Sequence, residues 1–421
     1  MATILIKNVE ISDKKSTHFG RKKNILIDGT HIKSISNETT LADKIIEAEG
    51  LKISAGWFDL RSSFCDPGYE HKESLETGCK AAARGGFTGV AILPETKPIV
   101  QSKDTVAYIK SKSAGYLTDI FPMAAVTTDL KGNELAEIMD LHHAGAVAFT
   151  DGLHTISHAG VLSLALQYLQ PIDGLIIQHA EDKNLTQFGQ MNEGIESTYL
   201  GLKGMPRLAE ELVIIRDLEL LEYAGGKIHF AHISSAKSVE LIANAKKKGL
   251  RVSCDVAVPN LIFDDSKLST FDTNFKLNPP LRTQNDIFSL WNGLENGTID
   301  AIATDHSPHD TESKHLEFDL ADFGMIQLET AFAALVTYKP AKIEISLLIE
   351  KLTNGPRNVL SLPILKMEEG EIANLTLYSE TEEWQYAADS ILSKSKNSPF
   401  INQTLTGKVK AVFNNGLVEI Y

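Results

Sequence analysis

The middle of this 421-residue chain alternates short apolar runs with amphipathic helical stretches, and no other sequence feature constrains the fold as strongly. Eight apolar runs have the length of buried strands. They fall at residues 55–60, 87–93, 119–125, 146–150, 174–179, 227–233, 251–256 and 300–304. Between two of them, residues 208–223 carry a helical face that is followed by a glycine pair at 225 and 226. That face is formed by Leu208, Leu212, Ile215 and Leu218.

Eight strand-helix units over roughly 250 residues are the size of a (β/α)₈ barrel, whose chemistry lies at the carboxyl ends of its strands. Both chain ends instead read as short β-strands, and Asn414-Asn415-Gly416 is typical of a hairpin turn. We therefore predict an α/β fold with a TIM-like barrel over residues 53–365. Residues 1–52 and 366–421 are predicted to form a small composite β-sandwich. An open doubly wound sheet is the alternative that the same alternation permits.

Composition excludes several classes of protein. Asp and Glu number 55 against 41 Lys and Arg, and this net charge of −14 disfavours nucleic acid as a partner. No apolar run approaches the roughly 18 residues of a membrane span, and the first residues lack the features of a secretory signal, so we expect a cytoplasmic protein. Cys65, Cys79 and Cys254 are too scattered for a disulfide framework or a cysteine zinc site.

Polar residues at the predicted strand ends are the candidates for chemistry. His229 and His232 lie on one strand and are predicted to point to opposite faces, so we expect only His232 to enter the barrel mouth. His179, His232 and Asp305 are the residue types that bind zinc, and a catalytic zinc keeps a position for water. Asp151 is either a further ligand or, because a glycine follows it, an ordinary turn aspartate.

Five segments, in the same order and spacing, resemble the type I dihydroorotases of the amidohydrolase superfamily, and residues 393–399 match as well. The segments are Gly85-Gly86-Phe87-Thr88, Gln178-His179-Ala180-Glu181-Asp182, His232-Ile233-Ser234-Ser235, Leu277-Asn278-Pro279-Pro280-Leu281-Arg282 and Ala303-Thr304-Asp305-His306-Ser307-Pro308-His309. The resemblance implies a (β/α)₈ barrel with a composite β-sandwich. It also implies zinc-dependent, reversible ring opening of dihydroorotate in pyrimidine synthesis.

By this resemblance, His179 and His232 are zinc ligands, and Asp305 is both a ligand and the acid/base that handles the water proton. Asp151 matches the family's bridging aspartate loosely, because the usual Asp-Asp-Gly is shortened to Asp-Gly. The resemblance assigns Asn278 and His309 to substrate contact.

The first strand departs from the family pattern. Family members have His-x-His followed by an arginine, whereas Arg61 and Ser63 occupy the histidine positions here and Cys65 occupies that of the arginine. A guanidinium has no lone pair to donate, and serine is a poor zinc ligand. Because a site of three or four protein ligands cannot lose two and stay tight, we expect at most one zinc ion, or none.

The predicted substrate pocket has changed as well. The family binds the substrate carboxylate with that arginine and with an asparagine whose position Glu95 occupies here. Cys65 and Glu95 replace attraction for a carboxylate by repulsion.

Arg61 would lie about where a metal ion sits in the family. We therefore expect an Arg61–Asp305 bridge that neutralises the carboxylate without metal, and the alternative is an Arg61 turned outward to solvent.

Three functions remain open. The first is a homologue with little or no hydrolysis, retained as a structural or regulatory partner of aspartate transcarbamoylase; family resemblance also makes a homodimer plausible. The second is an active hydrolase of dihydroorotate or another cyclic amide or ureide, with a single zinc. The third is a non-catalytic sensor of a small molecule.

Overall fold

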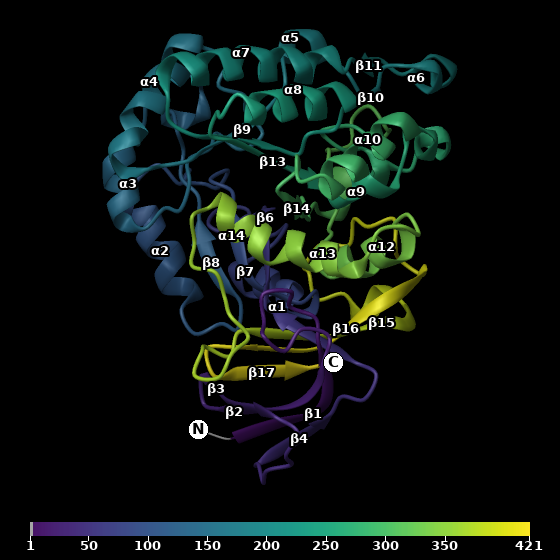
Figure 1. The fold of residues 1–421 in the computed structure, drawn as a ribbon. Coiled ribbons are helices and arrows are strands. Elements are labelled where there is room, and N and C mark those ends of the chain that lie inside the picture. Colours follow the sequence, from purple (N-terminus) through teal and green to yellow (C-terminus); the bar gives the residue numbers. More distant parts are fainter. Residues whose placement is uncertain (1–2) are drawn as a thin grey trace.

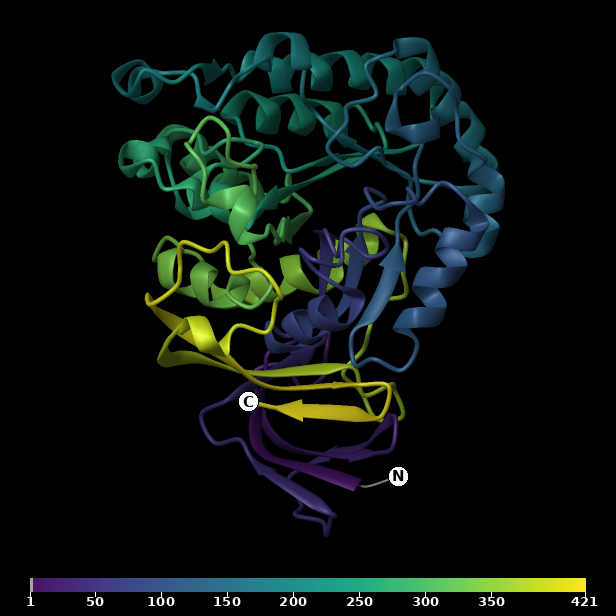
Figure 2. The ribbon, with the colours of Figure 1, turned by 180° about the vertical axis from the view of Figure 1, so that it is seen from behind.

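The structure is a computed structural model that describes residues 3–421, and it joins a strand-helix barrel to a β-sandwich (Figure 1). The barrel fills the upper part of the view. The sandwich lies below it and contains both ends of the chain, as the view from behind also shows (Figure 2). Within the described residues, no helix has the length and apolar character needed to cross a membrane.

The barrel wall consists of two groups of parallel strands. One group has the order β6-β7-β8, and the other has the order β14-β13-β12-β9. Isolated bridges close the ring, because Phe149 pairs with both Ala124 and Ile176 and because Ser62 pairs with His306. The predicted barrel is thus confirmed, and the open doubly wound sheet is wrong. The strands are β6 (Trp57–Ser62), β7 (Phe87–Ile92), β8 (Asp119–Pro122), β9 (Ile176–His179), β12 (Ile228–Ala231), β13 (Val252–Ala257) and β14 (Ala301–Ala303).

Two of the eight predicted strands differ from the structure. In the fourth, residues 146–150, pairing is reduced to the bridges of Phe149. The first was predicted to begin at Ala55, but Ala55 ends a sandwich strand and the barrel strand begins at Trp57. Gly56 separates the two strands, and a side chain there would overlap Asn374 and Thr88.

Helices surround the strands. The predicted helix 208–223 is α7 (Leu208–Ala224), which ends at Gly225 with a positive φ of 72°. The other long helices are α1 (Leu75–Arg84), α2 (Lys103–Ser113), α4 (Ala159–Leu169), α8 (Ala236–Lys247) and α10 (Gln284–Glu295). Shorter helices are α3 (Ile138–Ala144), α5 (Lys183–Thr186), α6 (Ile195–Leu200), α9 (Val258–Ile262), α11 (Thr311–Lys314), α12 (Ala331–Tyr338), α13 (Ile345–Leu352) and α14 (Asn354–Val359), and β10 (Met191–Asn192) pairs with β11 (Gly204–Met205).

The sandwich combines strands from both ends of the chain in one sheet of order β17-β16-β15-β5-β1-β2-β3, with β4 on β1. The two ends meet where β5 pairs antiparallel with β15. The predicted hairpin joins β16 to β17, and Asn415 and Gly416 have the positive φ values that such a turn requires. The strands are β1 (Thr3–Ile11), β2 (Lys22–Asp28), β3 (His31–Ser36), β4 (Lys44–Glu47), β5 (Lys52–Ala55), β15 (Leu375–Gln385), β16 (Thr404–Asn414) and β17 (Leu417–Ile420).

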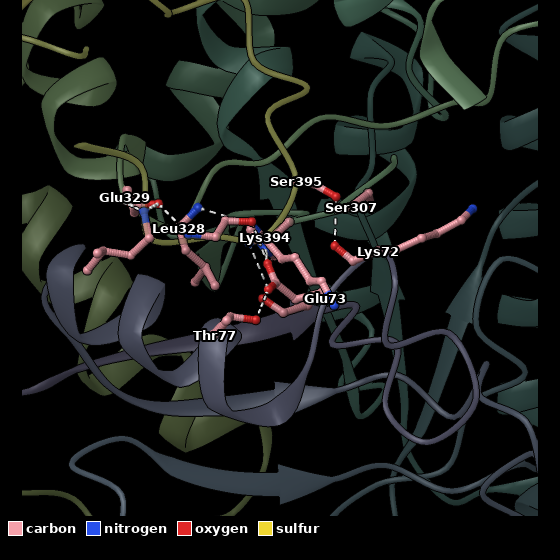
Figure 3. A network of polar contacts seen from close by, with 12 residues as sticks. Lys72, Glu73, Thr77, Ser307, Leu328, Glu329, Lys394 and Ser395 are labelled. Carbon is pink, nitrogen blue, oxygen red and sulfur yellow. Dashed lines mark hydrogen bonds and ion pairs between the residues drawn. The ribbon is translucent and has the colours of Figure 1, made fainter. Parts of the chain in front are cut away.

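A buried carboxylate fastens the segment before β16 to the barrel (Figure 3). Glu73, which is fully buried, accepts hydrogen bonds from the hydroxyls of Thr77 and Ser393 and from the backbone N–H of Lys394 at 3.1 Å. Burial by itself would raise the pKa of Glu73, but His306 and these hydroxyls outweigh it and lower the pKa. Beside it, Glu329 accepts from the backbone N–H of Ser393 at 3.0 Å. Two buried carboxylates therefore hold this segment in place.

Replacing Glu73 by alanine should lower the free energy of unfolding by about 3 kcal/mol, because Ser393, Thr77 and a backbone N–H would lose their acceptor. Glu76 lies three residues further along the chain, in the first turn of α1, and it pairs with Lys80 at an exposed position. The control E76A should leave stability essentially unchanged. Urea unfolding followed by circular dichroism measures both variants, and equal stabilities would contradict the role given to Glu73.

Candidate active site

Arg61 and Asp305 meet at the seam where the first and last barrel strands close. Arg61 lies near the end of β6, and Asp305 follows β14. The Nη1 of Arg61 donates to the Oδ1 of Asp305 at 3.3 Å, and the two side chains are 3% and 11% exposed. The predicted Arg61–Asp305 bridge is therefore confirmed, and the alternative of an outward-turned Arg61 is wrong.

His232 approaches the same carboxylate oxygen. Its Nε2 lies 3.4 Å from the Oδ1 of Asp305. Burial would raise the pKa of Asp305, but the charges of His232 and Arg61 outweigh it and hold the pKa below its usual range. For His232, burial would lower the pKa, whereas Asp255 and Asp305 raise it to about 9. One carboxylate thus faces two nitrogen groups in a buried mouth.

His232 reaches Asp305 as predicted, but the prediction that His229 and His232 point to opposite faces is wrong. Both rings bind Asp255 on β13: the Nε2 of His229 lies 2.9 Å from one of its oxygens, and the Nδ1 of His232 lies 2.6 Å from the other. The strand ends at Ala231, and His232 has a φ of 59°. This left-handed residue breaks the alternation on which the prediction depended.

His179 ends β9 and is almost fully buried. Its Nε2 is 3.4 Å from the Oε2 of Glu181, which also accepts from the Nδ2 of Asn278 at 3.0 Å. Burial lowers the pKa of His179 in spite of Glu181. Burial would raise the pKa of Glu181, but His179, Thr186 and Asn278 together lower it to about 2. The Glu181 carboxylate therefore links Asn278, a predicted substrate contact, to the predicted ligand His179.

Asp151 is used otherwise. Its Oδ1 accepts from the backbone N–H groups of Val126 and Thr127, both at 2.9 Å, and its Oδ2 accepts from the hydroxyl of Thr127. Because both oxygens already cap the loop that follows β8, this carboxylate serves as a structural cap. Of the two roles open to it in the sequence, the structure favours the turn residue over the ligand.

The other altered positions are 63, 65 and 95, and of these the charge of Arg61 acts on Glu95. The backbone N–H of Ser63 donates to the carbonyl of His306 at 2.8 Å. Burial raises the pKa of the Cys65 thiol to about 12, so the thiol is neutral. Burial also raises the pKa of Glu95, and Arg61 opposes this increase. A side chain at Gly152 would overlap the Glu95 carboxyl, so the two residues are packed directly together.

Both ring nitrogens of His309 are engaged. The Nε2 lies 2.9 Å from the carbonyl oxygen of Phe323, and the Nδ1 lies 3.1 Å from Asp322 and 3.2 Å from the Nζ of Lys72. In this arrangement the ring fastens the loop that contains residues 309–323. Contact with a substrate would require one of these bonds to open.

The buried polar atoms of the mouth differ from those that the metal centre implied by the sequence resemblance would need. Among residues 3–421, Arg61 Nη2, His232 Nε2 and both ring nitrogens of His179 are buried without a hydrogen-bond partner. The histidine atoms suit a metal ion, but Arg61 Nη2 can act as a donor alone. In the same range, no three His, Cys, Asp or Glu side chains are grouped to hold a metal. The residues do not fit the implied centre, and the cation beside Asp305 is a guanidinium.

Known structures define the class of this barrel. The L-hydantoinase (dihydropyrimidinase) from Arthrobacter aurescens superposes with a TM-score of 0.88, covering 100% of this chain and 98% of its own, at 24% sequence identity. A D-hydantoinase superposes with a TM-score of 0.83 at 21% identity and covers 99% of this chain and 95% of its own. The fold is therefore the one that these hydantoinases share, a strand-helix barrel with an attached sheet domain.

Sequence comparison is more specific. Residues 51–238 match the family model described as Dihydro-orotase-like. The dihydroorotase of Ruminiclostridium cellulolyticum is 41% identical over 96% of this chain and 95% of its own length. That of Acetivibrio thermocellus is 40% identical over 99% of both. The chain belongs to the dihydroorotase-like family of the amidohydrolase superfamily.

Sequence reasoning missed three residues of the mouth. Asp255 contacts the predicted ligand His232 and Glu181 contacts the predicted ligand His179, while His229 contacts Asp255. A buried aspartate within the apolar strand Val252–Ala257 was the available indication, since a buried charge needs a partner.

Replacing Arg61 by methionine should lower the free energy of unfolding by about 3 kcal/mol, because Asp305 would stay buried without its guanidinium. R61M/D305N should cost less than the sum of the two single variants, and urea unfolding of this double-mutant cycle measures the coupling. Arg251, which pairs with Asp173 on the surface, offers the control R251M, which should change little. Additive effects at 61 and 305 would contradict the bridge.

Proposed function

We propose that this chain is a dihydroorotase homologue of pyrimidine synthesis with little or no hydrolysis of its own, retained as a structural or regulatory partner of aspartate transcarbamoylase in the cytoplasm. The observation that carries the proposal is the Arg61 guanidinium at 3.3 Å from Asp305. It places a fixed cation at the carboxylate that the family resemblance assigns to metal and proton handling.

The chemistry of the mouth supports this reading. Hydrolysis of a cyclic amide needs a water that loses a proton near neutral pH, and a bound metal supplies that acidity. A guanidinium stays protonated, so Arg61 can neither take a proton nor donate a lone pair to a metal. Asp305 pairs with Arg61 and His232 instead of facing a metal-bound water. The carboxylate therefore has no nucleophile beside it to activate.

The substrate side supports it as well. Dihydroorotate carries a carboxylate, and the resemblance assigns its binding to an arginine and an asparagine. Cys65 and Glu95 stand at those positions. The thiol is neutral and Glu95 is an anion when ionised, so the pocket offers a carboxylate no charge partner there.

The aspartate transcarbamoylase part of the proposal comes from the family resemblance, in which members that have lost metal ligands assemble with that enzyme. This chain keeps the barrel and the β-sandwich, and it differs from the family pattern at residues of the barrel mouth. Such a chain is suited to a structural or regulatory role.

A second candidate is an active enzyme with one metal on His179 and His232, acting on a neutral or cationic cyclic amide or ureide. The buried ring nitrogens of these two residues favour it.

Metal content separates the two candidates. Protein purified from zinc-supplemented cells should contain well below one zinc per chain and should turn over dihydroorotate at the background rate. R61H/S63H removes the guanidinium and supplies two imidazoles, so it should bind about one zinc per chain or more. Elemental analysis measures the content, with R251H as the control. A wild-type protein with one zinc and robust turnover would support the single-metal enzyme instead.

The partner role has its own test. The chain and the aspartate transcarbamoylase of the same organism should co-elute from a sizing column when they are mixed, and the assembly of that enzyme should change when this protein is absent. Separate elution at every salt concentration would contradict the partner role while leaving the metal result untouched.

A further inference from the structure

A cavity of about 380 Å³ lies at the amino ends of four barrel strands. Its wall includes the residues that directly precede β9, β12, β13 and β14, which are Leu175, Lys227, Arg251 and Asp300. Arg61 and Asp305 lie at the carboxyl ends of β6 and β14 instead, so this cavity is separate from the mouth. Its volume falls within the range of roughly 300–1,000 Å³ that small-molecule sites have.

The ammonium group of Lys351 lies in the wall of this cavity with few partners. Lys351 is 8% exposed, and its Nζ donates to the carbonyl oxygen of Ile299 at 2.6 Å. An ammonium carries three N–H groups, and within residues 3–421 this is the one hydrogen bond of the Nζ. Burial lowers the pKa of Lys351 although Asp300 and Glu350 oppose the decrease, and both oxygens of Asp300 are already bound by the Nζ of Lys246. A buried cation is therefore available to an anion that enters the cavity.

Two further cations of the wall share a single carboxylate. The Nζ of Lys227 lies 2.8 Å from one oxygen of Asp173, and the Nη2 of Arg251 lies 2.6 Å from the other. Lys227, Arg251 and Lys351 thus have Asp173 and the exposed Glu350 as their remaining carboxylates. Positive charge is in excess at this end of the barrel although the whole chain is acidic, and such an excess favours an anionic ligand.

A second cavity, of about 360 Å³, adjoins the first, because Leu175, Lys227 and Ser361 line both of them. The Nζ of Lys227 donates to the hydroxyl of Ser361 at 3.1 Å where the two cavities meet. The wall of the second cavity contains a group of apolar side chains, which are Val147, Phe149, Ile172, Leu360 and Leu362. The two cavities therefore place an apolar space directly beside a cationic one.

We propose that the two cavities together bind a phosphomonoester that carries an aromatic or other apolar ring. The phosphate occupies the first cavity and accepts hydrogen bonds from Lys351, while Lys227 and Arg251 add positive charge beside it. Lysine and arginine are the side chains that bind phosphate, and its double negative charge balances the three cations better than a carboxylate does. The ring occupies the second cavity, where apolar walls remove it from water. Because the cavities lie at the opposite end of the strands from the mouth, this inference stands apart from the proposed function.

Phenyl phosphate is a simple probe of this chemistry. Isothermal titration calorimetry of the full chain should give a dissociation constant below about 1 mM for phenyl phosphate. Inorganic phosphate should bind at least about 10-fold more weakly, because it leaves the second cavity empty. Absence of phenyl phosphate binding at about 10 mM would overturn the site. Equal affinities for phenyl phosphate and inorganic phosphate would overturn the role of the second cavity.

Two variants locate the bound phosphate. K351M removes the buried ammonium and should weaken phenyl phosphate binding at least about 10-fold. N358E leaves the core unchanged, because Asn358 is an exposed residue of the cavity wall, and its new carboxylate should repel the phosphate and weaken binding by a similar factor. N285E makes the same change at an exposed position of α10 and should bind as the wild type does, with circular dichroism confirming that each variant is folded. Affinities that K351M and N358E leave unchanged would overturn the assignment of the phosphate to this cavity.

Discussion

The closure of the barrel between β6 and β14 is the constraint on which the mouth depends. Asp59 accepts the backbone N–H of Thr304 at 2.7 Å, and a backbone bridge follows three residues further along β6. Burial raises the pKa of Asp59 to about 6, against the hydrogen bonds it accepts. These bonds set the register of the first strand against the last. Arg61 lies two residues after Asp59, and Asp305 directly follows Thr304. The pairing of the two strands therefore brings the guanidinium to the carboxylate.

Arg61 supplies the positive charge that the buried Asp305 carboxylate needs. A carboxylate that is 11% exposed needs a positive partner, because an unpaired buried charge costs several kcal/mol. A metal ion and a guanidinium both provide the charge. They differ in chemistry, since the metal acidifies water and the guanidinium does not. Either cation can therefore pair with the buried carboxylate in the same fold.

The sequence predicts the barrel because hydrophobic periodicity reports which side chains are buried, and it predicts the hairpin because Asn-Gly turns need positive φ. It also predicts the Arg61–Asp305 bridge, because the ends of the first and last strands are neighbours in any closed barrel. It could not predict that His232 turns left-handed, since only a few per cent of residues other than glycine adopt that conformation and nothing in the sequence marks His232 among the histidines. The sequence also could not settle the role of Asp151, because the tertiary structure determines which hydrogen-bond donors the carboxylate meets.

The changes at positions 61 and 95 compensate one another. Arg61 adds a positive charge to the mouth, and Glu95 adds a carboxyl group whose pKa burial raises and Arg61 lowers. Glu95 fits because Gly152 has no side chain to meet it. By the family resemblance, a metal ion and a substrate carboxylate supply these two charges from outside. Here Arg61 and Glu95 are part of the chain itself, and Arg61 meets Asp305 at 3.3 Å without any ligand between them.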